Sequence, residues 1–136
     1  MPELEIPKKI FEQMLQQALA EAPLEACGIL AGKDSYVEKL YKMTNVDNSS
    51  NHFMMEPKEQ FAVIKDIRTS GFEMLAIYHS HPNTPARPSA EDIRLAFTQD
   101  VVYVIVSLKN SNRPTVRGFI IEDGNVTEVL VKIVEL

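Results

Sequence analysis

The tetrapeptide His79-Ser80-His81-Pro82 constrains this chain most, because it directly follows a short apolar run at residues 74–78. A glycine and a proline bound the run, and its length and composition predict a buried strand. Side chains two residues apart lie on the same face of a strand. The imidazoles of His79 and His81 are therefore expected to leave the end of this strand in the same direction.

A stiff connection leads from His81 to Asp92. Three prolines occur before Ser89 and exclude helix until the last of them. Ser89 suits a helix N-cap, and Asp92 stands three residues later, as in a capping box. The carboxylate of Asp92 is thus expected in the first turn of a helix, near the end of the strand. That helix is predicted to continue with an apolar side made by Ile93, Leu95, Ala96 and Phe97.

Two neutral imidazoles and one carboxylate are a common ligand set for catalytic Zn²⁺, and they leave a fourth position for water. The simpler alternative is that Asp92 only caps its helix and that the two histidines are incidental. The presence of both Ser89 and Asp92 behind the histidine pair favours the metal site. We therefore predict one Zn²⁺ per chain, held by His79, His81 and Asp92.

The motif His79-Ser80-His81-Pro82 with Ser89-Ala90-Glu91-Asp92 resembles the signature of the JAMM, or MPN+, metalloprotease family. That family also has an upstream Glu, and residues 23–32 resemble its segment of a Glu before a Cys-Gly-apolar strand. The resemblance spans nearly the whole chain. It implies an α/β sandwich around a curved mixed sheet, an architecture similar to that of cytidine deaminases.

The resemblance assigns the family's catalytic Glu to Glu25, which would serve as general base and then general acid without binding the metal. Glu21 is the nearest competitor, and local chemistry alone does not choose between the two. The resemblance also gives Ser89 the role of an oxyanion donor, besides its role as N-cap. Ser80 should point to the opposite face of the strand and is interpreted as structural.

Other candidate residues have simpler interpretations. Cys27 could be a thiol nucleophile, but the apolar run after it favours a buried, inert thiol. His52 lies in a polar loop and is interpreted as solvated or packed rather than as a ligand. In the same loop, Phe53, Met54 and Met55 are either core anchors or an apolar lip for a substrate tail, and we favour anchors.

The rest of the chain alternates helices and strands early and pairs strands late, which predicts a mixed sheet with helices against it. Apolar residues at helical spacing after Pro7 predict an amphipathic first helix. Pro57 should open a second helix, with Phe61, Ile64 and Ile67 inward and Gly71 as its stop. The remaining predictions are strands at 27–31, 36–43, 101–108, 115–122 and 126–134, a polar loop at 45–56, and a hairpin turn at Asp123-Gly124.

Composition narrows the class of protein. The 136 residues are expected to form a single domain with a core of its own. A net charge of −5 lacks the basic character of a nucleic-acid binder. No signal peptide is evident and no apolar run approaches membrane-spanning length, so we expect a cytoplasmic protein without nucleic-acid or membrane partners. A single Cys excludes an internal disulfide.

The resemblance implies a zinc metallopeptidase that cleaves after the C-terminal Gly-Gly of a ubiquitin-like modifier or sulfur-carrier protein. The alternative is a non-catalytic scaffold of the MPN type, which the complete set of predicted ligands makes less favourable. A zinc nucleobase deaminase would need H-x-E and P-C-x-x-C, and the chain has neither. Oligomeric state stays open, with a homodimer among the alternatives.

Overall fold

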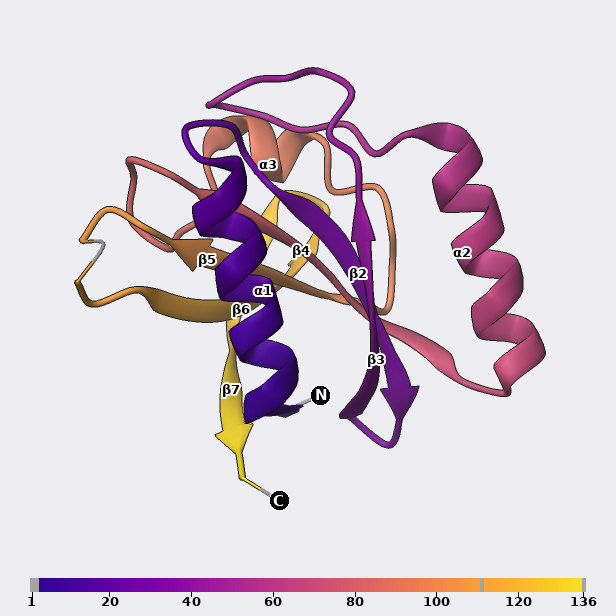
Figure 1. Ribbon diagram of the computed structural model, residues 1–136. Coiled ribbons are helices and arrows are strands. Elements are labelled where there is room, and N and C mark those ends of the chain that lie inside the picture. Colours follow the sequence, from indigo (N-terminus) through magenta and orange to yellow (C-terminus); the bar gives the residue numbers. More distant parts are fainter. Residues whose placement is uncertain (1–2, 111, 136) are drawn as a thin grey trace.

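A computed structural model describes residues 3–110 and 112–135 (Figure 1). Its strands form one mixed sheet that closes on itself in the order β1-β3-β2-β4-β5-β6-β7. The elements in chain order are β1 (Glu3–Pro7), α1 (Lys8–Glu21), β2 (Cys27–Lys33), β3 (Tyr36–Met43), α2 (Pro57–Ser70), β4 (Glu73–His81), α3 (Ala90–Arg94), β5 (Val102–Ser107), β6 (Thr115–Glu122) and β7 (Asn125–Val134).

The predicted mixed α/β sheet is confirmed, but its closure into a barrel was not foreseen. No strand was predicted before the first helix. In the structure β1 pairs in parallel with β7 through five residue pairs and touches β3 through Glu5 and Tyr36. This short strand joins the two edges of the sheet, so that neither edge is left unpaired.

Two apolar cores lie on the two faces of the sheet. α1 covers one face, where Met14 and Ala18 pack among buried residues of β1, β2, β4 and β5. α2, α3 and the loop at residues 45–56 cover the other, where Ile67 and Met55 meet Ile77 and Ile105. In Figure 1, α1 stands in front of the sheet and α2 lies to the right of the sheet.

Helix ends follow the predicted signals. Pro57 begins α2, the Glu56 side chain accepts a hydrogen bond from the Glu59 backbone N–H at 2.8 Å, and Gly71 ends the helix at φ 75°. The Asp123-Gly124 turn is confirmed as well. Both of its residues have positive φ, 52° and 79°, as a two-residue hairpin between β6 and β7 requires.

Two predictions about helical faces were wrong. Phe61 is 74% exposed and Ile64 is 37% exposed, so only Ile67 of the three expected inward residues of α2 is buried. The helix after Ser89 stops at Arg94 after little more than one turn, and Phe97 beyond it is 80% exposed. Periodicity alone did not reveal that these apolar side chains face solvent.

A buried polar contact fixes α1 against the strands that carry the site. The Tyr78 hydroxyl on β4 donates to Oε1 of Gln17 at 2.6 Å, and Nε2 of Gln17 donates to the Cys27 carbonyl at 3.0 Å. Gly28 makes this possible, because a Cβ there would fall 2.2 Å from the Tyr78 ring. The start of β2 is thereby held beside β4, with Cys27 in register with His79.

None of the helices in the described ranges is both long and apolar enough to cross a membrane.

Candidate metal centre

His79 and His81 lie at the carboxyl end of β4 with their rings turned to the same side, as predicted. Their Nε2 atoms are 3.1 Å apart. Oδ2 of Asp92, from the first turn of α3, lies 3.3 Å from Nε2 of His79 and 3.0 Å from Nε2 of His81. Three ligand atoms from two elements thus converge on one point, although all three side chains are almost fully buried.

These separations fit a zinc ion. Three ligands bound at 2.0–2.1 Å with tetrahedral angles would be separated from one another by about 3.3 Å. The observed separations of 3.0 to 3.3 Å are close to that value without rearrangement. The donor set of two imidazoles and one carboxylate also suits zinc.

The tautomer of His81 and the neutral ring of His79 suit metal binding. Nδ1 of His81 lies 2.9 Å from the Pro85 carbonyl, which can only accept, so this nitrogen carries a proton and Nε2 is the nitrogen available to a metal. Burial lowers the pKa of His79 and keeps its ring neutral. Burial also opposes charge on His81, but its contacts with Asp92 and Pro85 outweigh this and raise its pKa.

Asp92 is held as an anion. Burial acts against its charge, but hydrogen bonds with both imidazoles and with the Ser89 N–H hold its pKa well below the usual range. Ser89 and Asp92 form the predicted capping box: the Ser89 N–H donates to Oδ2 of Asp92 at 2.9 Å, and the Asp92 N–H donates to Oγ of Ser89 at 3.0 Å. The cap therefore aims the carboxylate at the histidines.

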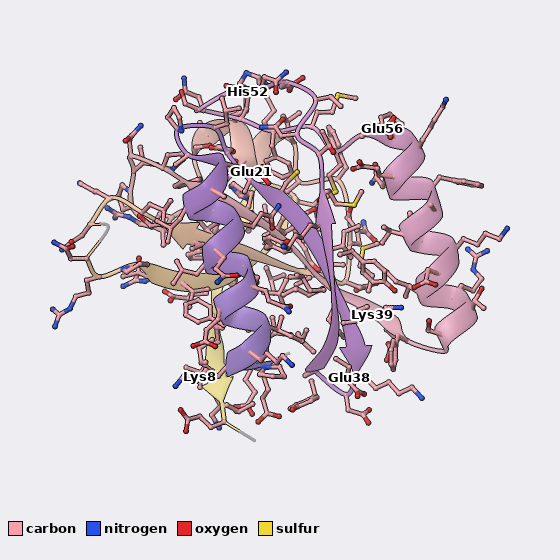
Figure 2. All side chains as sticks on the ribbon, viewed as in Figure 1. Lys8, Glu21, Glu38, Lys39, His52 and Glu56 are labelled. Carbon is pink, nitrogen blue, oxygen red and sulfur yellow. The ribbon has the colours of Figure 1, made fainter. Side chains whose placement is uncertain are left out.

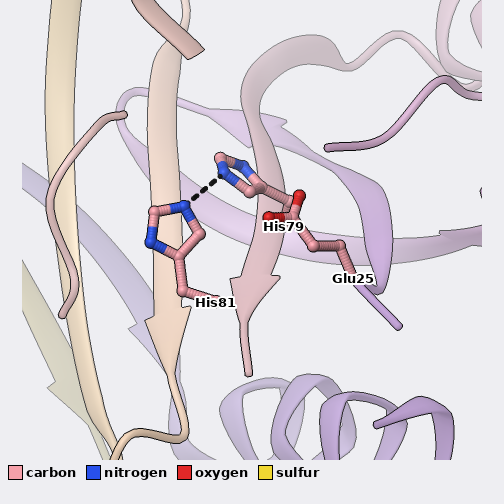
Figure 3. Close-up of side chains that lie close together, drawn as sticks. All are labelled: Glu25, His79 and His81. Carbon is pink, nitrogen blue, oxygen red and sulfur yellow. Dashed lines mark hydrogen bonds between the residues drawn. The ribbon is translucent and has the colours of Figure 1, made fainter. Parts of the chain in front are cut away.

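Glu25 lies beside the same point, whereas Glu21 closes α1. Its carboxylate offers an oxygen within 4.8 Å of ring nitrogens of both histidines, and Figure 3 shows it turned toward them. The residue is 3% exposed, and its Oε1 has no hydrogen-bond partner within the described part of the chain. Burial raises the pKa of Glu25 to about 8, with His81 lowering it and Asp92 raising it.

The backbone around Glu25 is tied to β4 and to the loop at residues 45–56. The Ala26 N–H donates to Oγ of Ser80 at 2.8 Å, which confirms a structural role for Ser80 on the opposite face. Nδ2 of Asn45 donates to the Glu25 carbonyl at 3.0 Å, and the Glu25 N–H donates to the Ser49 carbonyl. Asn45 was not among the predicted site residues, because a polar residue at the start of a polar loop gives no signal of burial.

The loop at residues 45–56 borders the site. Phe53 stacks on the His79 ring with centroids 4.6 Å apart. Met55 is buried as an anchor, but Met54 is 53% exposed, so the anchor prediction fails for that residue. His52 is partly exposed and contacts Oδ2 of Asp47 at 3.0 Å; Figure 2 labels it on this loop.

A cleft of about 500 Å³ opens onto the site. His79 and Asp92 lie in its wall, and the loop at residues 45–56 forms one side. Leu95 and Phe97, which follow α3, form part of another side. Cys27 takes no part in the cleft lining: it is fully buried, and burial raises the pKa of its thiol to about 12.

Comparisons with known proteins show which family the chain belongs to. Residues 7–119 match the family described as prokaryotic homologs of the JAB domain. The chain is 36% identical to a CysO-cysteine peptidase of Mycobacterium tuberculosis, over 97% of this chain and 92% of that protein. It is 33% identical to a "Probable TtuB-protein conjugate cleaving protease" of Thermus thermophilus, over 94% of this chain and 82% of that one.

A solution structure of a protein from Desulfitobacterium hafniense superimposes with a TM-score of 0.89 at 42% identity. The match covers 98% of this chain and 94% of that chain. The chain therefore belongs to the prokaryotic JAB domain family, as the resemblance implied.

Proposed function

We propose that this protein is a zinc-dependent metallopeptidase that hydrolyses the bond after the C-terminal Gly-Gly of a ubiquitin-like modifier or sulfur-carrier protein. One observation carries the proposal. Nε2 of His79, Nε2 of His81 and Oδ2 of Asp92 lie 3.0–3.3 Å from one another, beside a buried carboxyl group. His79 and Asp92 also line the cleft. A bound zinc would acidify a water molecule and polarise the scissile carbonyl.

Glu25 is the proton carrier in this proposal. A carboxyl group whose pKa lies near neutrality can take a proton from the attacking water and return it to the leaving amine. Its free Oε1 gives it an atom for this task. The bonds to the Ala26 N–H and the Glu25 carbonyl hold the backbone that carries this side chain in place, so little backbone reorganisation is needed when the reaction starts.

Ser89 can serve as cap and oxyanion donor at the same time. Its Oγ accepts from the Asp92 N–H, which uses a lone pair and leaves the hydroxyl proton free. Ser89 is exposed and is joined to Asp92 by the two hydrogen bonds of the capping box. Donation of this proton to the oxygen that becomes negative would lower the barrier to attack.

The cleft favours an extended tail without side chains. Its volume is about 500 Å³, and the His79 ring lies against Phe53 at its wall. Glycine lets a backbone approach closely and adopt conformations that other residues avoid. One relative is named a CysO-cysteine peptidase and the other a probable TtuB-protein conjugate cleaving protease, which supports a conjugate as substrate.

The test uses a panel of small ubiquitin-fold proteins ending in Gly-Gly, each joined through its terminus to Cys or to a Lys side chain. Mass spectrometry should show release of the amine with an unchanged Gly-Gly end, and a zinc chelator should abolish it. Glu25→Gln should retain metal and fold but lose turnover by about a hundredfold or more. Equal turnover of unrelated unstructured peptides would contradict specificity for such conjugates, and a fully active Glu25→Gln would contradict the mechanism.

A further inference from the structure

A basic groove lies beside the metal centre and has no role in the chemistry above. Its volume is about 820 Å³, and no carboxylate lines it. Four of its lining side chains are cationic and exposed: Arg87, Lys109, Arg113 and Arg117. Within residues 3–110 and 112–135, only Arg117 of these four has an acidic partner, Glu128, at 3.9 Å. On a chain with net charge −5, this is a local concentration of uncompensated positive charge.

One loop separates the groove from the catalytic cleft. Residues 82–88 contribute Pro85 and Arg87 to the groove and Pro88 to the cleft. The same loop is fixed by the site, because Pro85 accepts from His81 and the Thr84 carbonyl accepts from Oγ of Ser107 at 2.6 Å. The two cavities are therefore neighbours across a short, proline-stiffened wall.

The sheet register places both cavities on the same face. His81 pairs with Ser107, which pairs with Thr115, and both partners line the groove. Directly opposed residues of neighbouring strands point to the same face, and strands lie about 4.8 Å apart. The groove thus begins at Ser107, roughly 5 Å from His81, and reaches Thr115 at roughly 10 Å. A standard interface covers about 800 Å² of each partner, a patch roughly 30 Å across, so one bound protein would reach both.

We propose that this groove docks an acidic face of the protein whose tail enters the cleft. The proposal rests on the function proposed above and adds the recognition of the folded part of the substrate. Arginine forks match carboxylate geometry, and three of the four cations are arginines. The groove is open and its charges are exposed, which suits attraction of a protein surface rather than enclosure of a small anion. Four cations on a chain of net charge −5 form a small basic patch, unlike the strongly basic surface expected of a nucleic-acid binder.

The test compares two double variants with the same total charge. Lys109→Glu with Arg113→Glu changes the groove. Lys65→Glu with Arg68→Glu changes α2, which lies on the other side of the molecule from the β5–β6 connection in Figure 1. Each reversal changes the net charge by −2, so both variants move from −5 to −9. A third variant, Lys109→Arg with Arg113→Lys, keeps the charge of the groove.

The substrates are a folded conjugate that the wild type cleaves and a short peptide conjugate with the same Gly-Gly end. At about 50 mM salt, the groove reversal should lower kcat/KM on the folded conjugate by about tenfold or more, mainly through KM. It should leave the short peptide within about twofold of the wild type. The difference should shrink at about 0.5 M salt. The α2 reversal and the charge-keeping variant should behave like the wild type.

Unchanged cleavage of the folded conjugate by the groove reversal would overturn the docking proposal and leave the peptidase intact. An equal loss with the α2 reversal, or an equal loss on the short peptide, would overturn it too, because docking would then not be the cause. If the wild type cleaved no conjugate, the proposed function would fail. In that case, binding of a fluorescent ten-residue oligoglutamate would still test whether the groove takes an acidic ligand. Equal binding by the groove reversal and the α2 reversal would refute it. Oligonucleotide binding is measured for the same variants. If the groove reversal lost oligonucleotide binding but cleaved the conjugate as the wild type does, the groove would be a nucleic-acid site instead.

Discussion

Asn45→Ala gives a sharp test of how the site is positioned. The Asn45 side chain is 5% exposed and forms four hydrogen bonds. Its Nδ2 donates to the carbonyls of Glu25 at 3.0 Å and His52 at 3.1 Å. Its Oδ1 accepts from the N–H groups of Asp47 and Met54, both at 3.1 Å. These four bonds use both N–H protons and both lone pairs of the amide.

The alanine variant would leave four backbone groups without these partners. A typical hydrogen bond contributes about 1 kcal/mol net, and a buried group left unsatisfied costs about 1–3 kcal/mol. Water can reach the part of the loop that carries Asp47 and Met54, so we expect a loss of about 2–4 kcal/mol in the free energy of unfolding. A small domain has about 5–15 kcal/mol in total, so the variant should still fold at 25 °C.

Activity should fall as well, because the Glu25 carbonyl loses its anchor. A displacement of about 1 Å at a catalytic group can cost roughly a hundredfold in rate, and we expect a fall in kcat with a nearly unchanged KM. Urea unfolding followed by circular dichroism gives the stability, and cleavage of a conjugate gives kcat. Asn51→Ala is the matched control, since Asn51 is exposed in the same loop and, among the described residues, its side chain has no hydrogen-bond partner; its backbone N–H donates to Oγ of Ser49.

A stability change below about 0.5 kcal/mol in Asn45→Ala would refute the four-bond account, because it would mean that water replaces the amide at no cost. A clear loss of stability with wild-type kcat would show that Asn45 holds the loop but does not position Glu25. Asn45→Asp keeps the two acceptor bonds but turns a buried carboxylate oxygen toward the carbonyls of Glu25 and His52, so its stability should fall at least as far as that of the alanine variant.

Three further predictions concern the metal ligands, the Ser89 hydroxyl and the Cys27 thiol. Protein purified without added metal should contain near-stoichiometric zinc by elemental analysis, and His81→Ala should lose it; full retention would mean that the ligand set is wrong. Ser89→Ala should lower kcat by about a hundredfold while the cap costs only about 1 kcal/mol, so a fully active but less stable variant would leave Ser89 as a cap alone. Iodoacetamide at pH 7.5 should neither label Cys27 in the folded protein nor reduce turnover, because the thiol is buried and its pKa of about 12 keeps it protonated. Labelling should occur once the protein is unfolded in guanidinium. Inactivation of the folded enzyme would support a thiol mechanism instead.

Local patterns were enough for much of the fold and for most of the candidate site. The strand before His79, the capping box of Ser89 and Asp92, the Pro57 start of α2 and the Asp123-Gly124 hairpin all depend on residues within a few positions of one another. Backbone sterics, caps and side-chain periodicity act over that distance, so a single sequence can show them. The spacing of two imidazoles and a carboxylate was readable for the same reason.

Tertiary structure decided what depends on segments far apart in the chain. Closure of the sheet by β1, the place of Glu25 beside the imidazoles, and the burial of Asn45 each need contacts that no local pattern encodes. The basic groove gathers its four cations from a loop and from the β5–β6 region, where they look like ordinary surface charges in sequence. Phe61 shows the converse, since its spacing suits a core and yet the fold leaves it 74% exposed. Sequence fixes which side chains an element can present, but only the packing of elements determines which of them meet one another and which meet water.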